Sequence, residues 1–250
     1  GIYRFAHRPT TAKTRIIAHS QQILRIDKED NRPITEETEK KIIGYINETL
    51  PAMDGVICSD YQKGILTPKV LKAIMHRAQN SKKQVIIDPK SVDFSEYQGA
   101  TVITPNQKEL ERAVPIKINT KDDLERGAEY LLNLTKAQAL LVTRGKDGMI
   151  LYKNKGEPME IPTRAKEVYD VTGAGDTATS VFGMAVFSGF DFHEAAVLAN
   201  MAAGIVVGKL GTAVVTLNEI NAYLQEEMLL ATNAILELEE LKQIVSMAKS

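Results

Sequence analysis

The sequence lacks several features that would place the protein in a particular class. It contains one cysteine, Cys58, so an internal disulfide is excluded, and its four histidines show no metal-ligand spacing, which argues against a structural metal site. The 31 basic and 32 acidic residues leave a formal net charge of −1. A near-neutral chain has no overall attraction for nucleic acid or for an anionic membrane.

Long hydrophobic runs are also missing. The most apolar stretch runs only from residue 178 to residue 190, whereas a membrane-spanning helix needs about 20 residues. The first residues carry charges where a signal peptide has an apolar core. We therefore expect a cytoplasmic protein. The hydrophobic fraction of 44% and the charged fraction of 25% are those of a globular chain of one large or two small domains.

The hydrophobic pattern predicts a regular alternation of strands and helices. We expect a strand–turn–strand ribbon over 12–27 and a helix over 35–50. Four continuous apolar runs follow, with helical patterns between them, and then come a hairpin over 149–162 and two apolar helices. The four runs are 54–60, 84–89, 100–105 and 139–143. This alternation is typical of parallel strands covered on both faces, so we predict an α/β fold with a doubly wound, mostly parallel sheet and a small β-ribbon.

The most informative motif is the segment DVTGAGD, Asp170–Asp176, which opens an apolar helix. Gly173, Ala174 and Gly175 present backbone N–H groups without bulky side chains, and the helix N-terminus adds partial positive charge. An anion such as a transferring phosphoryl group can bind there, and Asp176 can accept a proton from an attacking hydroxyl. The alternative is an ordinary helix start with glycines used for packing. GAGD arises by chance in roughly one of two hundred chains of this length, which favours function.

A second segment, Asn106–Glu109, follows a predicted strand and opens a helix. Its amide and carboxylate can hold a hydrated Mg²⁺ and nucleotide phosphates, because Mg²⁺ commonly keeps several waters. An Asn at the cap with a Glu three residues later is equally an ordinary capping box. The residues alone leave both interpretations open.

Three further groups lie beyond predicted strand ends, where open parallel sheets place their ligands. Thr143 and Gly145 follow the fourth strand, although, taken alone, a glycine-bearing turn into the hairpin explains them better than a ligand site does. Asp60 and Lys63 follow the first strand, and Lys90 follows the second. Either lysine can contact a substrate phosphate as a mobile point charge. A solvated surface lysine is the commoner outcome for any single one.

Together these pieces resemble the ribokinase-type family of sugar kinases, whose hallmarks are a GAGD anion hole with a catalytic aspartate and an N-x-x-E magnesium motif. Over roughly residues 8–225, segments such as RPTTAKTRIIAHSQQILRID and SDYQKGILTP are similar to the members that act on heptose 7-phosphate. This resemblance implies ATP-dependent phosphorylation of the anomeric hydroxyl in lipopolysaccharide precursor synthesis. Another sugar as substrate, or nucleotide binding without turnover, remains the alternative.

The resemblance also implies a role for individual residues. It makes Asp176 the base and residues 173–175 the anion hole, and it assigns Asn106 and Glu109 to Mg·ATP. It places further residues in the nucleotide pocket, namely Thr143, Gly145, Asn200, Gly211 and Thr212. Asp170 and Thr172 match positions that bind a monovalent cation such as K⁺ in some relatives. Independently of the resemblance, we take Asp60, Lys63 and Lys90 as candidate substrate residues, with the two lysines as contacts of the substrate phosphate.

The two ends of the chain depart from the family pattern, and the ribbon suggests a partner. The family opens with a strand and a Gly-Gly segment, and this chain has no Gly-Gly pair, so we expect an N-terminally incomplete kinase domain over 1–225 that is poorly active alone. Residues 226–250 resemble the helical lead-in to an adenylyltransferase domain in bifunctional relatives. The ribbon at 12–27 resembles a lid that pairs subunits, which implies a homodimer.

Overall fold

The structure is a computed structural model that describes residues 2–5, 8–18, 21–163, 169–209 and 211–233. One six-stranded sheet has the order β3-β4-β5-β6-β7-β8. Its first four strands are parallel and its last two are antiparallel, which confirms the predicted mostly parallel sheet. The strands are β3 (Gly55–Ser59), β4 (Gln84–Asp88), β5 (Val102–Ile103), β6 (Ala139–Thr143), β7 (Met149–Lys153) and β8 (Met159–Ile161).

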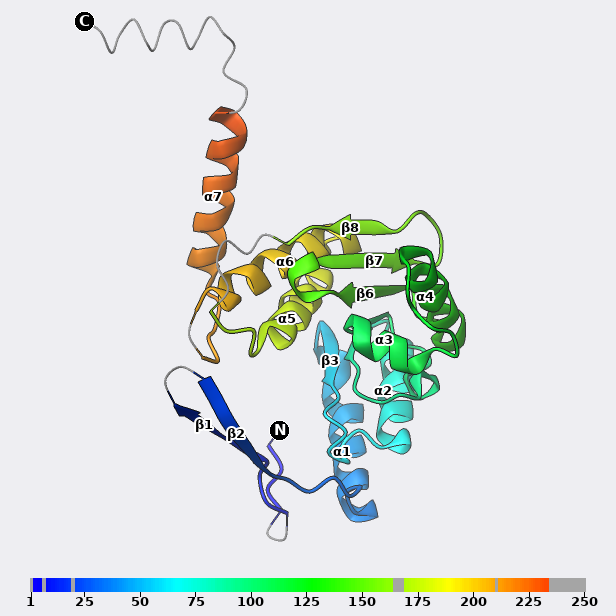
Figure 1. The fold of residues 1–250 in the computed structure, drawn as a ribbon. Helices are drawn as coiled ribbons and strands as arrows, with labels where there is room; N and C mark the ends of the chain where they lie inside the picture. Colours follow the sequence, from blue (N-terminus) through cyan, green and yellow to red (C-terminus); the bar gives the residue numbers. More distant parts are fainter. Residues whose placement is uncertain (1, 6–7, 19–20, 164–168, 210, 234–250) are drawn as a thin grey trace, which may run out of the picture.

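Helices cover both faces of this sheet because its strands are apolar on both sides (Figure 1). Ile86 and Ile87 are adjacent in β4, and their fully buried side chains belong to two different core clusters. The cluster of Ile87 includes side chains of α2 (Pro68–Asn80), α3 (Gln107–Ala113) and α4 (Lys121–Thr135), with α1 (Glu36–Thr49) packed against it. The cluster of Ile86 includes side chains of α5 (Ala174–Phe187) and α6 (Phe192–Val207). The fold is therefore doubly wound, as predicted.

Most of these helices begin at a side chain that caps the first turn. Thr35, Thr67 and Asn106 accept N–H groups at the starts of α1, α2 and α3, and Thr120 and Asp191 do so for α4 and α6. Helix α5 differs, because its cap is Gly173 and no side chain among the described residues caps it. The Ala174 N–H donates to the carbonyl oxygen of Val171 over 3.3 Å, and the N–H groups of the turn that follows are left for a ligand.

The predicted ribbon is present as β1 (Ala12–Ala18) and β2 (Gln21–Lys28), an antiparallel pair that forms its own sheet beside the main body (Figure 1). At another side, α7 (Leu217–Asn233) projects away from the sheet. Of the expected lead-in 226–250, residues 226–233 belong to α7, and 234–250 lie outside the described residues.

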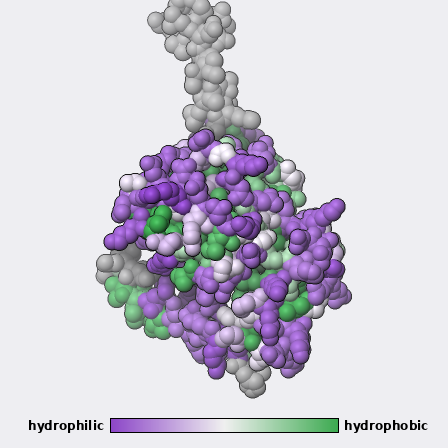
Figure 2. Space-filling model, turned by 90° about the vertical axis from the view of Figure 1, so that its right-hand side faces the viewer, coloured by the Kyte–Doolittle hydropathy of each residue, from purple (hydrophilic) through white to green (hydrophobic). Residues whose placement is uncertain are grey.

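The surface is mixed in character. The face in Figure 2 is mostly hydrophilic, with hydrophobic residues scattered among the polar ones. None of the described helices is both long and apolar enough to cross a membrane.

Candidate functional site

A cavity of about 200 Å³ lies at the carboxyl edge of the parallel strands. Each of the four parallel strands contributes the residues at or just after its end, and α5 contributes its first turns. Such an edge is where open α/β sheets bind ligands. The lining residues are Asp60, Tyr61, Asp88, Pro89, Lys90, Thr104, Asn106, Glu109, Thr143, Gly173, Gly175, Asp176 and Thr179. The structure thus brings together eight of the residues singled out from the sequence.

The start of α5 forms one wall of this cavity. Gly173 has a φ of 84°, a left-handed conformation that favours glycine, and a Cβ at Gly173 or Gly175 would meet nothing within 4 Å. The space in front of the uncapped helix N-terminus is therefore open. Ala174 and Gly175 form the first turn together with Asp176, whose carboxylate is exposed. This arrangement can bind an anion beside a carboxylate.

The carboxylate of Asp176 has a partner that the sequence did not suggest. The hydroxyl of Tyr61 donates a hydrogen bond to its Oδ1 over 2.7 Å. Burial raises the pKa of Tyr61 to about 12, and so do its hydrogen bond to Asp176 and the negative charge of that residue. The phenol therefore stays protonated at neutral pH. Tyr61 therefore acts as a donor to this carboxylate.

The same cavity is also lined by the Asn106–Glu109 motif, and the structure shows this motif as a capping box. The Glu109 N–H donates to Oδ1 of Asn106, and the Asn106 N–H donates to Oε2 of Glu109, both over 2.9 Å. The other oxygen of Glu109 pairs with Nζ of Lys90 at 3.2 Å. The capping interpretation is confirmed, and Lys90 lies at this motif rather than apart from it. A buried carboxylate beside the cavity remains able to order a hydrated cation.

Asp88 makes this cavity electrostatically unusual. Burial, followed by the charges of Asp176 and Glu109, raises the pKa of Asp88 to about 7. Its Oδ2 accepts a hydrogen bond from Ser59 over 3.4 Å. The excess of carboxylate groups suits a cation that arrives with phosphates and water. In the described part of the chain, no group of three or more His, Cys, Asp or Glu side chains could hold a metal ion directly.

A turn after β3 separates this cavity from a larger one of about 1200 Å³. The buried Asp60 carboxylate accepts hydrogen bonds from the backbone and side-chain amides of Gln62, at 2.7 and 2.8 Å, and from the Tyr97 hydroxyl at 2.6 Å. Asp60 therefore shapes this turn. Lys63 lies at its far end, where Nζ pairs with Glu29 at 2.5 Å.

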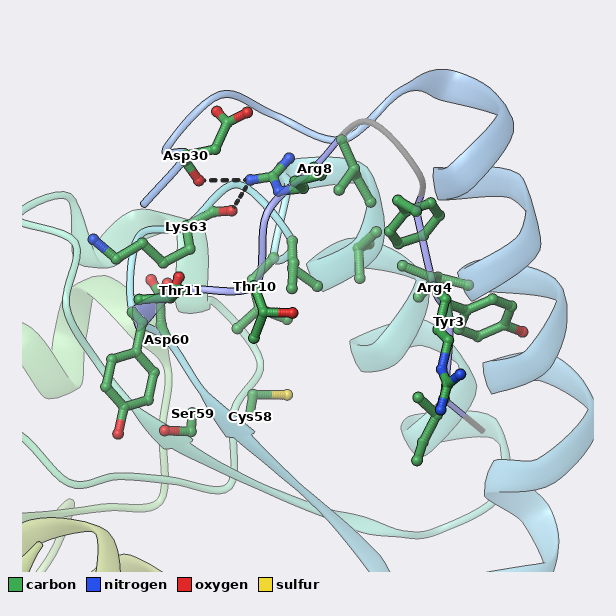
Figure 3. A pocket seen from close by; sticks show the side chains of 18 of the residues that line it. Tyr3, Arg4, Arg8, Thr10, Thr11, Asp30, Cys58, Ser59, Asp60 and Lys63 are labelled. Carbon is green, nitrogen blue, oxygen red and sulfur yellow. Dashed lines mark hydrogen bonds between the residues drawn. The ribbon is translucent and has the colours of Figure 1, made fainter. Parts of the chain in front are cut away.

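The larger cavity lies between the N-terminal segment, β3, α1 and α2 (Figure 3). Arg8 closes one end of it by donating to the carbonyl oxygens of Asp30, at 2.9 Å, and Lys63. Thr10, Thr11 and Lys63 bring polar groups to a wall that otherwise contains the aliphatic side chains of α1 and α2. A polar, sugar-sized molecule can reach Asp60 and Tyr61 from this side.

Other sequence candidates lie outside the small cavity. Asn200 is buried in α6 and donates to the Pro162 carbonyl oxygen over 2.7 Å. Asp170 accepts the N–H of Thr172 over 2.8 Å and that of Gly211, and the Thr172 side chain is the main cause that lowers the pKa of this aspartate. Gly145 and Thr212 are exposed. Their nucleotide and cation roles remain predictions.

Sequence reasoning missed Tyr61, Asp88 and the pair Thr104–Thr179. The hydroxyls of that pair lie 2.9 Å apart and join the end of β5 to α5. The rule that ligands lie beyond strand ends pointed to the right segments, SDYQKG and DPK, because Tyr61 and Asp88 stand in them. It did not show which side chains of those segments turn toward α5.

Comparisons with known proteins agree with this geometry. The profile described as "pfkB family carbohydrate kinase" matches residues 1–219. The chain is 43% identical over 235 residues to the bifunctional protein HldE of Desulfatibacillum aliphaticivorans, covering 94% of this chain and 48% of that protein. It is 46% identical over 222 residues to HldE of Geotalea uraniireducens, covering 89% and 45%. The chain thus spans about half the length of these relatives.

A structural comparison finds the same fold. The ribokinase of Arabidopsis thaliana, solved with ribose and ATP, superposes with a TM-score of 0.70 at 18% identity, covering 86% of this chain and 69% of that one. This likeness establishes a ribokinase-like fold.

Proposed function

The chain belongs to the pfkB family of carbohydrate kinases, and from this we propose that it transfers the γ-phosphoryl group of ATP to the anomeric hydroxyl of D-glycero-D-manno-heptose 7-phosphate. The product is the 1,7-bisphosphate, a precursor of the ADP-heptose of lipopolysaccharide. The observation that carries the proposal is that the uncapped N-terminus of α5, with Gly173, Gly175 and Asp176, lines one cavity together with Asn106 and Glu109.

The first turn of α5 supports the chemistry of the transfer. Asp176 takes the proton of the anomeric hydroxyl. The hydroxyl oxygen bonds to the γ-phosphorus, and the bond between that phosphorus and the leaving ADP oxygen breaks. The backbone N–H groups of the turn Gly173–Gly175 stabilise the charge on the transferring phosphoryl oxygens. Catalysis then rests on positioning two substrates in line.

The remaining candidates divide between the nucleotide and the cations. Asn106 and Glu109 would order the waters of Mg²⁺, which supplies charge neutralisation at the β- and γ-phosphates. Thr143 lines the same cavity. We assign the outer part of the nucleotide pocket to Gly145, Asn200, Gly211 and Thr212. Asp170, whose pKa is lowered by its hydrogen bonds to Thr172, and Thr172 itself form the proposed K⁺ site.

The larger cavity supports binding of the sugar phosphate. Asp60 holds the turn that separates the two cavities, and Lys63 lies at its far end. Lys63 would have to break its ion pair with Glu29 to contact the phosphate of the sugar. Lys90, which is paired with Glu109, would instead contact the phosphates of ATP.

The ribbon supports pairing with a second copy. Ile16, Ile23, Leu24 and Ile26 expose 45–62% of their surface on β1 and β2, and an apolar two-stranded sheet of this kind is stabilised by a partner. We therefore propose a homodimer in the cytoplasm.

Two assays on the full-length gene product test this function. A coupled kinase assay with heptose 7-phosphate, hexose phosphates and free sugars identifies the acceptor, and calorimetry with an ATP analogue measures nucleotide binding. Asp176→Asn should lower turnover about 10²–10⁴-fold and leave ATP affinity unchanged. Wild-type turnover in this variant refutes the base, and preference for a hexose phosphate refutes the named substrate. ATP binding without turnover on any acceptor supports the nucleotide-binding alternative.

A further inference from the structure

Tyr61 lines both cavities, because the turn that carries it lies between them. Tyr61 is 48% exposed, and its hydroxyl contacts Asp176, a residue 115 positions away in the sequence. The side chain therefore lies where a sugar in the larger cavity would meet a phosphoryl donor in the smaller one.

The turn beneath Tyr61 is held in one conformation. Gln62 has a φ of 52°, which is uncommon for a residue other than glycine. The buried Asp60 carboxylate stabilises it through its bonds to Gln62, and the buried Tyr97 hydroxyl donates to the same carboxylate while accepting the backbone N–H of Ser91 over 3.0 Å. Two strand-end loops are thereby tied together, and the backbone of Tyr61 is fixed relative to the sheet.

The hydrogen bond from Tyr61 then fixes Asp176 relative to the same sheet. At 2.7 Å it joins a phenol to a carboxylate, the charge-assisted class of hydrogen bond. It engages Oδ1, so Oδ2 is the carboxylate oxygen that Tyr61 leaves for a substrate hydroxyl. An exposed aspartate in the first turn of a helix can adopt more than one rotamer, and the bond from Tyr61 selects one of them.

We propose that Tyr61 is a positioning residue that holds the Asp176 carboxylate at the boundary between the two cavities, so that one defined oxygen accepts the proton of the sugar hydroxyl. This inference rests on the proposed function, in which Asp176 is the base. Tyr61 acts through Asp176 and forms no bond to the transferred group.

Kinetics of Tyr61→Phe in the full-length gene product test the proposal, because Phe keeps the ring and removes only the hydroxyl. We expect kcat to fall at least about tenfold, the usual weight of a hydrogen bond to a charged group, with an unchanged KM for ATP. Tyr130→Phe, which alters an exposed tyrosine on α4, is the matched control and should keep wild-type kinetics. In an Asp176→Asn background, Tyr61→Phe should cost little further rate.

A second measurement needs no turnover. With 3,5-difluorotyrosine at position 61, the phenol titrates in a milder pH range, and ¹⁹F NMR follows it. Asp176→Asn should lower the pKa of this phenol, since it removes a negative partner, and should leave difluorotyrosine at position 130 unaffected. An unshifted phenol at position 61 overturns the contact.

The kinetic outcomes separate this inference from the proposed function. Full activity of Asp176→Asn refutes the base assignment itself. Wild-type kcat in Tyr61→Phe, alongside an impaired Asp176→Asn, overturns only the role of Tyr61. An equal loss from Tyr61→Phe in both backgrounds also overturns it, because Tyr61 would then act independently of Asp176.

Discussion

Replacing Asp88 with asparagine should stabilise the protein without ligands, by an amount that grows from about pH 4 to about pH 7 and stays constant above it. Burial and the charges of Asp176 and Glu109 raise the pKa of this carboxyl from 3.8 to about 7. Between these two pH values, the folded protein retains a proton that the unfolded chain has released. Raising the pH through this window therefore destabilises the fold, because the unfolded state binds fewer protons there than the native state.

The size of the effect follows from the same numbers. A pKa difference of about 3 corresponds to roughly 4 kcal/mol at about 1.4 kcal/mol per pH unit. Part of the carboxylate faces the cavity, where water screens its charge, so we expect about 2 kcal/mol for Asp88→Asn above pH 7. Asparagine still offers an oxygen to the Ser59 hydroxyl, which contacts Oδ2 in the native protein.

Urea unfolding of both proteins between pH 4 and pH 8.5 measures this difference. The two unfolding free energies should converge near pH 4, and the variant should become progressively more stable up to about pH 7. Asp54→Asn, at an exposed aspartate, serves as the control and should track the wild type throughout. A constant offset between Asp88→Asn and the wild type across this range would refute the electrostatic reasoning.

Three further predictions concern single residues. Gly175→Ala should leave the free energy of unfolding unchanged or raise it by up to about 1 kcal/mol, because a Cβ there meets nothing within 4 Å. Turnover in the kinase assay should nevertheless fall, because the added methyl group occupies the space of the phosphate. Glu109→Gln retains an acceptor for the Asn106 N–H, so melting should barely change, whereas the Mg²⁺ concentration needed for half-maximal ATP binding should rise in calorimetric titrations. Burial raises the pKa of Cys58 from 9.0 to about 12, so iodoacetamide should alkylate it about 1000-fold more slowly in native than in urea-unfolded protein at pH 8, as mass spectrometry can measure.

The sequence was sufficient for the fold because each local signal agreed with the global one. The run QVIID is apolar on both faces, and in the structure Ile86 and Ile87 enter opposite core clusters. The helices between the strands begin at side-chain caps of the expected type, Thr67 for α2 and Thr120 for α4. Differences at the ends are small, as in β5, which is paired only over Val102–Ile103 although the apolar run extends over 100–105.

The site was predictable only in part. Motifs that lie within one turn, such as Gly173–Asp176 and Asn106–Glu109, are visible in a linear sequence. Lys90 could not be assigned to the wall of Glu109, because that ion pair depends on how β4 and α3 pack. The Tyr61–Asp176 contact depends on two elements from different layers, and nothing local to either residue indicates it.

The approach of α5 to the sheet explains why this contact forms. Asp176, Thr179 and Gly183 lie on one face of the helix, at the i, i+3 and i+7 positions. A Cβ at Gly183 would lie 2.6 Å from Cδ1 of Ile57 in β3, so glycine lets the helix come close to that strand. Thr179 then reaches the hydroxyl of Thr104 over 2.9 Å.

A reciprocal glycine at the far end of the same face completes the close packing. Gly55 opens β3, and a Cβ there would lie 2.3 Å from the ring of Phe187, at the end of α5. Helix and strand are therefore in close contact at Gly55 and at Ile57 of β3. Since Tyr61 follows β3 directly and Asp176 lies two turns before Gly183, the spacing of the two glycines places the carboxylate beside the phenol. The catalytic geometry proposed for this protein thus depends on two positions far from the chemistry, where an added Cβ would force either the side chains of Ile57 and Phe187 or α5 itself to shift.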